Sequence, residues 1–354
     1  MKQGLKKRLL DFPGFEAFCR TLTRSHVRSL MYHRFSPESV HDARFVNPHV
    51  LKTQMNYICD HYTVIEPDQH LEALNGCVPG RCPVAVTVDD GYADFHDVAY
   101  PIFREFGVPA MLFVATGFIS GDTWFWWDKL AYLIKEASPG EYRVDTGAKT
   151  IFMDLTSDTG RNSSWHRVAD RCRFMKDEKK EALLVDLAIQ LGIQLPSPPP
   201  TEYAPVTWNQ IREMNQNGIK FGAHTVHHPI LSRVPFHIAR EEILESKNQL
   251  EKELQHPINW FAYPQGGPAD FNDRIKAIVK ENFDGCFLAY QEMDNPGDKY
   301  SLPRSCVTND ITSFRWVLCG AEFLGLKIRK LLGLQTGVTR AYWAGSDEEE
   351  AMHE

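Results

Sequence analysis

Two neighbouring carboxylates form the first candidate for chemistry in this sequence. Asp89 and Asp90 follow an apolar run directly and are themselves followed by Gly91. Adjacent carboxylates repel each other, and a divalent cation or a shared proton relieves that repulsion. Asp-Gly is also a common turn dipeptide. Because a helix-like segment comes next, the pattern predicts a strand-to-helix loop rather than a hairpin.

A pair of histidines forms the second candidate. His224 and His228 stand four residues apart at the end of another apolar run, and Pro229 follows at once. With 14 histidines in the chain, the spacing alone is weak evidence. Two imidazoles and one carboxylate, however, make a three-ligand site with an open position, which is typical of catalytic zinc. We expect His227, between them, to point outward to solvent.

Short apolar runs alternate with amphipathic stretches along most of the chain, which predicts a parallel sheet covered by helices. About seven such units predict a closed or nearly closed barrel, whose active site lies at the carboxyl ends of the strands. The apolar runs are Leu30–His33, Tyr62–Ile65, Val84–Val88, Ala110–Ala115, Ile219–His224, Trp260–Tyr263 and Cys286–Ala289. The amphipathic stretches are 49–60, 95–106, 207–217, 237–255 and 270–282.

The alternation stops between Ala115 and Thr207, where no clean strand–helix unit appears. We interpret residues 120–204 as an insertion on the loop side of the barrel, which shapes substrate access or forms a surface subdomain without a role in binding. The predicted organisation is a basic amphipathic helical region at 1–28, a barrel at 29–310, and a helix with an acidic tail at 311–354.

Composition excludes several classes of protein. The net charge of -7 gives no support to nucleic-acid binding, and the eight cysteines include no C-x-x-C pair of the thiolate-zinc or redox type. No apolar stretch is long enough for a transmembrane helix and no signal peptide is recognisable, so we expect a cytoplasmic protein. In residues 1–28, apolar and basic side chains alternate. This region is a surface helix on an anionic membrane, or a helix docked on the barrel.

Together the two motifs resemble those of the polysaccharide deacetylases, also called NodB-homology proteins or carbohydrate esterase family 4. The segment Thr87–Gly91 resembles the family's Thr-Phe-Asp-Asp-Gly motif, and His224–His228 resembles its His-Ser/Thr-x-x-His motif. Flanking segments at 100–110 and 205–208 are similar too, and the resemblance covers roughly residues 30–120 and 205–305. It implies an incomplete or distorted (β/α) barrel of the α/β class, in agreement with about seven parallel strands.

The resemblance also implies roles for individual residues. Asp89 would be the general base, and Asp90, His224 and His228 would bind a divalent metal, with zinc expected. The stretch 262–266 resembles the family's third motif but lacks its arginine. A main-chain N–H near Gln265 would face the oxyanion, and Arg304 is the candidate to replace the missing arginine.

The family's general-acid histidine near the C-terminus has no match here. Leu30–His33 resembles the permuted arrangement of the poly-N-acetylglucosamine deacetylases, which makes His33 the candidate acid; the alternative is a core histidine. Phe125, Trp126, Trp127 and Trp208 are candidates for sugar stacking, although aromatic residues more often belong to a core.

The predicted function is removal of an N-acyl, expected N-acetyl, group from an amino sugar in a cell-surface polysaccharide or its precursor. The alternatives are a deacylase or deformylase of a lipid-linked or small amide, and an inactive carbohydrate-binding barrel. The expected partner is an N-acylated amino sugar, with peripheral membrane contact through residues 1–28 and an inner-face membrane location as a further alternative.

Overall fold

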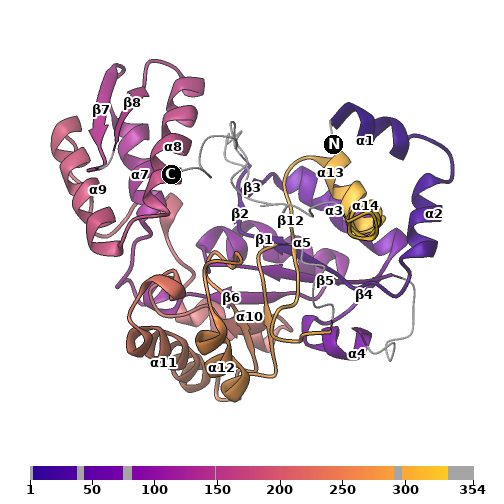
Figure 1. Ribbon diagram of the computed structural model, residues 1–354. Helices are drawn as coiled ribbons and strands as arrows, with labels where there is room; N and C mark the ends of the chain where they lie inside the picture. Colours follow the sequence, from indigo (N-terminus) through magenta and orange to yellow (C-terminus); the bar gives the residue numbers. More distant parts are fainter. Residues whose placement is uncertain (1–2, 38–43, 75–81, 148, 291–296, 334–354) are drawn as a thin grey trace. The chain divides into compact units, whose positions relative to one another are not determined.

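The computed structural model describes residues 3–37, 44–74, 82–147, 149–290 and 297–333 (Figure 1). The chain divides into two compact units. Among the described residues, the first comprises those up to Ser120 and from Pro205 onward, and the second comprises Gly121–Ala204. The segment 121–204 is thus a unit of its own, in the interval where the sequence shows no strand–helix alternation.

The first unit is built on one sheet of parallel strands. Seven strands follow the order β11-β10-β9-β6-β5-β1-β12, and β4 pairs with the start of β5. A single bridge, Phe287 to Leu302, links β11 to the segment leading into β12, so the two ends of the sheet come together without a regular ladder. The predicted incomplete barrel is confirmed. The strands are β1 Arg28–Tyr32, β4 Thr63–Val64, β5 Pro83–Val88, β6 Met111–Val114, β9 Lys220–Ala223, β10 Trp260–Ala262, β11 Gly285–Phe287 and β12 Ser305–Cys306.

Each of the seven predicted apolar runs overlaps one of these strands, because a parallel sheet is buried on both faces and needs continuous apolar sequence. The two-residue strand β12 has no such run and was not predicted. In Figure 1 the strands cross the middle of the unit, with α11 and α12 below them and α3 and α13 above. The surrounding helices are α3 Pro48–His61, α4 His70–Leu74, α5 Tyr100–Phe106, α6 Thr116–Ile119, α10 Trp208–Gln216, α11 Phe236–Leu254 and α12 Asp273–Asn282.

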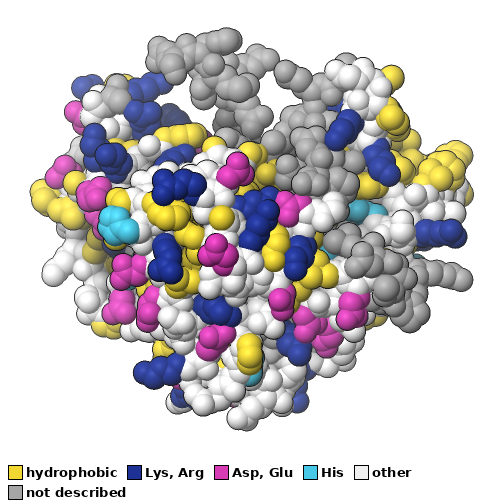
Figure 2. Space-filling model, turned by 60° about the horizontal axis from the view of Figure 1, so that its bottom comes forward, with side chains coloured by type: hydrophobic (Ala, Val, Ile, Leu, Met, Phe, Trp, Pro, Cys, Tyr) yellow, Lys and Arg dark blue, Asp and Glu magenta, His cyan; other side chains and the backbone are white. Residues whose placement is uncertain are grey.

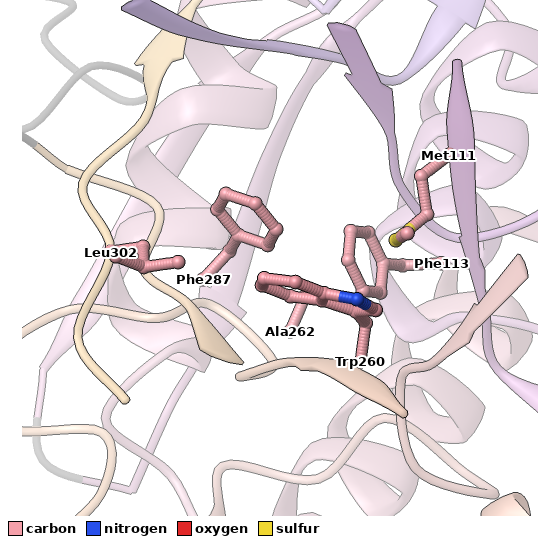
Figure 3. Close-up of a cluster of buried hydrophobic side chains, with 6 residues drawn as sticks. All are labelled: Met111, Phe113, Trp260, Ala262, Phe287 and Leu302. Carbon is pink, nitrogen blue, oxygen red and sulfur yellow. The ribbon is translucent and has the colours of Figure 1, made fainter. Parts of the chain in front are cut away.

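Side chains that point into the barrel form a closely packed apolar cluster (Figure 3). The rings of Phe113, Trp260 and Phe287 turn toward one another, and the centroids of Trp260 and Phe287 are 5.4 Å apart. A Cβ at Gly222 would lie 2.3 Å from the Phe113 ring, so only glycine fits this strand position. The cluster fills the interior below the strand ends and leaves the carboxyl ends for polar groups.

The remaining short elements of the first unit are connections. They are β2 Arg34–Phe35, which pairs with β3 Phe45–Val46, the 3-10 helices η1 Pro67–Gln69 and η4 Leu231–Arg233, and the π-helix η2 Phe95–Ala99. The predicted helix at 95–106 is therefore a π-helical turn that continues into α5.

The second unit has its own secondary structure. Its elements are α7 Trp126–Glu136, the antiparallel pair β7 Glu141–Asp145 and β8 Thr150–Asp154, α8 Asp158–Cys172, α9 Asp177–Leu191 and η3 Thr201–Tyr203. The polar stretch at 156–164 forms the start of α8, where the Ser157 hydroxyl accepts a hydrogen bond from the N–H of Gly160. Phe125, Trp126 and Trp127 belong to an aromatic cluster of this unit.

The two ends of the described chain pack together on the first unit. Helices α1 Gln3–Leu10 and α2 Phe15–Leu22 meet α13 Ile311–Leu318 and α14 Ala321–Leu331 around a small cluster that contains Leu10, Cys19 and Cys319. The predicted acidic tail lies outside the described residues. Among those that are described, no helix is long and apolar enough to span a membrane.

Candidate active site

Strand register brings the two sequence motifs to the same end of the sheet. Tyr32 of β1 pairs with Val88 of β5, so His33 and Asp89 follow side by side, and the Asp89 N–H donates to the Tyr32 carbonyl. Strand β6 lies between β5 and β9, and its last residue, Val114, accepts from the N–H of His224. The carboxyl ends of these strands therefore present His33, the acid pair and His224 together.

Asp90 and His224 form a potential metal site together with His228. One ligand atom each from Asp90, His224 and His228 lies within 4.8 Å of the others. The Oδ1 atom of Asp90 is 3.6 Å from His224 Nε2 and 3.5 Å from His228 Nε2. These separations are too long for strong hydrogen bonds. Metal–ligand bonds of about 2.0–2.2 Å hold tetrahedral ligand atoms roughly 3.3–3.6 Å apart, so the geometry fits a small divalent ion.

The His224 ring is already in the form that a metal requires. Its Nδ1 lies 2.7 Å from the main-chain carbonyl of Ala262, at the end of the neighbouring strand β10. Because a carbonyl only accepts, Nδ1 carries the proton and Nε2 presents its lone pair toward Asp90. Burial lowers the pKa of His224 to about 3, which keeps the ring neutral at pH 7.

The loops that carry these ligands adopt an unusual backbone conformation. Asp90, Thr225 and His228 have φ values of 76°, 67° and 59°, in the left-handed region that side chains other than glycine rarely adopt. Such residues cost on the order of 1 kcal/mol or more each and persist only where the surroundings hold them. Part of the support is local, because the Thr225 hydroxyl accepts a hydrogen bond of 3.0 Å from the N–H of His228.

A buried carboxylate on α11 holds the same histidine loop from the outside. Glu242 Oε2 accepts from the N–H groups of Val226 and His227 at 2.9 and 2.8 Å, and Oε1 lies 2.7 Å from His227 Nδ1. The His227 side chain is 54% exposed, as expected for an outward-pointing residue. Sequence reasoning missed Glu242. The available signal was an acid on the mostly apolar buried stripe of α11, beside Ala239 and Ile243.

Asp89 forms a fully buried ion pair with Arg304. The two guanidinium nitrogens Nη1 and Nη2 donate to Oδ1 and Oδ2 of Asp89, each at 2.6 Å. The Nε atom donates to the Leu288 carbonyl at 2.7 Å, and Nη1 also donates to the Thr87 hydroxyl at 3.0 Å. Arg304 has no solvent exposure. It immediately precedes β12 and thereby reaches the carboxylate that the sequence analysis named as the base.

His33 and Gln265 border this cluster. Desolvation lowers the pKa of His33, while nearby Asp89 opposes that shift and Arg304 reinforces it. Gln265 lies in the turn after β10 with a φ of 58°. Its main-chain N–H makes no hydrogen bond within the described part of the chain. Three residues before it, Ala262 contacts His224, so this turn borders the histidine side of the site.

Comparison with known proteins agrees with this geometry. Residues 176–282 match the family model described as polysaccharide deacetylase. This match includes His224, His228 and Gln265, whereas His33, the acid pair and Arg304 lie outside it. A search of curated protein sequences found no match.

Several solved structures share the fold. The deacetylase PplD of Streptococcus pyogenes, in complex with acetate, is 22% identical, with a TM-score of 0.53 over 80% of this chain and 93% of that one. IcaB from Ammonifex degensii is 18% identical, with a TM-score of 0.51 over 82% and 97%. A de-N-acetylase from Aggregatibacter actinomycetemcomitans is 16% identical, with a TM-score of 0.51 over 81% and 99%.

At these identities the structural likeness establishes the fold, and the family match adds the sequence signal of the second motif. The predicted resemblance to the polysaccharide deacetylases is confirmed. The same findings support the prediction of a hydrolase that acts on amide bonds of N-acetylated sugars.

Proposed function

We propose that this chain, with its polysaccharide deacetylase domain, is a metal-dependent enzyme that removes an N-acetyl group from an amino sugar of a polysaccharide or of its precursor. The proposal rests on the position of the candidate metal ligands beside a candidate base. A three-ligand set, Asp90, His224 and His228, lies next to a second carboxylate, Asp89, that Arg304 orients. Metal ligands beside a separately held base are what amide hydrolysis by water requires.

Zinc is the proposed ion, because two neutral imidazoles and one carboxylate are borderline ligands that suit it. When bound, the ion would polarise the acyl carbonyl and lower the pKa of a coordinated water. The protein's contribution is to keep His224 in the right tautomer through the Ala262 carbonyl and to hold the loop of His228 through Thr225 and Glu242.

Asp89 is the proposed general base. Arg304 engages one lone pair on each carboxylate oxygen and so fixes the plane of the group, while the remaining lone pairs can accept a proton from water. As water attacks, negative charge develops on the acyl oxygen. The main-chain N–H of Gln265 is the proposed donor to that oxygen, because it has no competing hydrogen bond in the described residues.

His33 is the proposed general acid for the departing nitrogen. An amine leaves poorly unless it is protonated, and the register of β1 with β5 sets His33 beside Asp89. Desolvation lowers the pKa of His33, so its ring rests in the neutral form. In this proposal Asp89 first accepts a proton from the attacking water. The proton then passes to His33, which is protonated only during turnover and donates it to the departing nitrogen.

The test is metal content combined with acetate release from N-acetylglucosamine oligomers. We expect about one equivalent of zinc in the parent protein and little in His224→Asn. His237→Asn, an exposed histidine of α11, is the matched control and should behave like the parent. Metal binding without acetate release from any N-acetylated sugar would refute the proposed reaction, and absence of metal binding would refute the mechanism.

A further inference from the structure

Exposed apolar side chains gather on the helices at the two ends of the chain. The described residues include twelve large hydrophobic side chains that are exposed, and seven of them belong to α1, α2, α14 or residues directly beside these helices. We call this set the terminal-helix surface. Its apolar members are Leu5, Phe12, Phe18, Leu22, Ile328, Leu331 and Leu332. A concentration of this kind marks an interaction site rather than scattered surface residues.

These side chains form stripes because of helical spacing. Phe18 and Leu22 are four residues apart on α2, and Ile328 and Leu331 are three apart on α14, so each pair lies on one helix face. A neighbouring face of α2 carries Cys19, which is buried in a cluster with Cys319 and Ala321 where α13 leads into α14. Helices α2 and α14 pack against each other, and both lie at the right of Figure 1 with α1 above them.

Basic side chains accompany the apolar stripes. The exposed charged residues of 3–28 and 321–333 include six cations and a single anion, Asp11, although the whole chain has a net charge of -7. The cations are Lys7, Arg8, Arg24, Lys327, Arg329 and Lys330. In the upper right of Figure 2, hydrophobic and basic side chains lie close together. Positive charge is therefore concentrated where apolar exposure is greatest.

We propose that the terminal-helix surface docks the protein peripherally on a lipid bilayer that contains anionic headgroups. Short amphipathic helices with aromatic and leucine side chains on one side and lysine and arginine beside them lie in the plane of a membrane interface. A second copy of this chain is a poorer occupant, because a two-fold contact would bring the same cations against one another. An anionic bilayer matches both the charge and the apolar stripes.

This docking is independent of the proposed catalysis, so it is tested by binding rather than by activity. Full-length protein is mixed with vesicles of phosphatidylcholine alone or of phosphatidylcholine with phosphatidylglycerol, and flotation is measured at low and high salt. We expect flotation only with the anionic vesicles and a decrease at high salt. Lys327→Ser and Arg24→Ser should each weaken the partition coefficient on the order of fivefold.

Apolar variants provide the second arm. The double variant Phe18→Ser and Leu331→Ser should lose most of the flotation, whereas Ile189→Ser is the matched control. Ile189 is 73% exposed but belongs to the second unit, so its replacement should have no effect. Circular dichroism is the check that each variant is folded.

Three results would overturn the proposal. One is equal flotation with neutral and anionic vesicles, or none with either. Another is a loss in Ile189→Ser as large as in the double variant. The third is salt-independent self-association in sedimentation without vesicles that the double variant abolishes, because this result would assign the surface to a second copy of the chain.

Discussion

Replacing Arg304 by methionine is the sharpest perturbation of the site, because it removes one half of a buried ion pair and leaves the other half in place. The Asp89 side chain is 3% exposed and that of Arg304 is fully buried, so water cannot take over the lost hydrogen bonds. The variant also removes the donors to the Leu288 carbonyl and the Thr87 hydroxyl. Methionine fills most of the space, which keeps the cavity contribution small.

The expected cost is large relative to the stability of a domain. Breaking a buried ion pair by removing one partner costs about 3–5 kcal/mol, out of a total of roughly 5–15 kcal/mol. Adding Asp89→Asn to Arg304→Met removes the stranded charge as well. The double variant should therefore be more stable than the sum of the two single changes predicts, with a coupling energy of about 2 kcal/mol.

The assay is urea unfolding followed by tryptophan fluorescence, with zinc content and acetate release measured on the same preparations. The hydrogen bonds of Arg304 run to Asp89, Thr87 and Leu288 rather than to the three proposed metal ligands, so Arg304→Met should keep its metal while it loses acetate release. Arg104→Met, an exposed arginine on α5, is the control and should change stability by less than about 0.5 kcal/mol. A cost below about 1 kcal/mol for Arg304→Met, with acetate release intact, would refute both the ion pair's importance and the proposed role of Asp89.

Three further predictions concern metal binding and acid stability. Glu242→Gln should weaken zinc affinity, measured by chelator competition, by about 10- to 100-fold, because carboxylates around a metal site orient its ligands. The change Glu241→Gln at the exposed neighbouring residue should leave the affinity unaltered. Equal zinc affinities of the two variants would show that Glu242 does not support the site. Asp90→Ala should abolish stoichiometric zinc in elemental analysis, and retention of the metal would mean that another group replaces this ligand. Burial lowers the pKa of His70 to about 4 against about 6.5 in the unfolded chain, so the unfolded state binds the proton first and stability falls as the pH drops from 6.5 toward 4. Between pH 7 and pH 5, the free energy of unfolding measured in urea should therefore fall by about 2 kcal/mol less for His70→Leu than for the parent. Identical decreases would contradict this assignment.

Much of the fold follows from local sequence. The runs that became β1, β5 and β9 are continuously apolar because both faces of a parallel sheet are buried, and the predicted helices between them start at capping residues such as Asn47, Thr207 and Asn272. The short strand β12 carried no comparable signal. It forms because one edge of β1 is open at Leu30 and Met31, and the returning chain pairs there through Ser305 and Cys306.

The site residues likewise fall into those that local sequence indicates and those that it does not. Asp89 with Asp90 and His224 with His228 are near neighbours in the chain, so residue type and spacing were enough to select them as candidates. The role of Arg304 was proposed only because the stretch 262–266 lacks the arginine of the family's third motif. No local sequence pattern connects Arg304 with Asp89, which is 215 positions away in the chain. Glu242 was missed because its position on the buried stripe of α11 is a weak signal among the other acids of that helix.

Sequence alone therefore determined the alternation of strands and helices and the two motifs, since both depend on interactions between near neighbours in the chain. Tertiary structure decided which distant groups meet: Arg304 on Asp89, Glu242 on the histidine loop, and α14 beside α2. It also imposed the left-handed backbone at Asp90 and His228. These features depend on strand register and on the burial of the whole barrel. The free energy of that burial arises from the complete fold, so no short segment of the sequence specifies it.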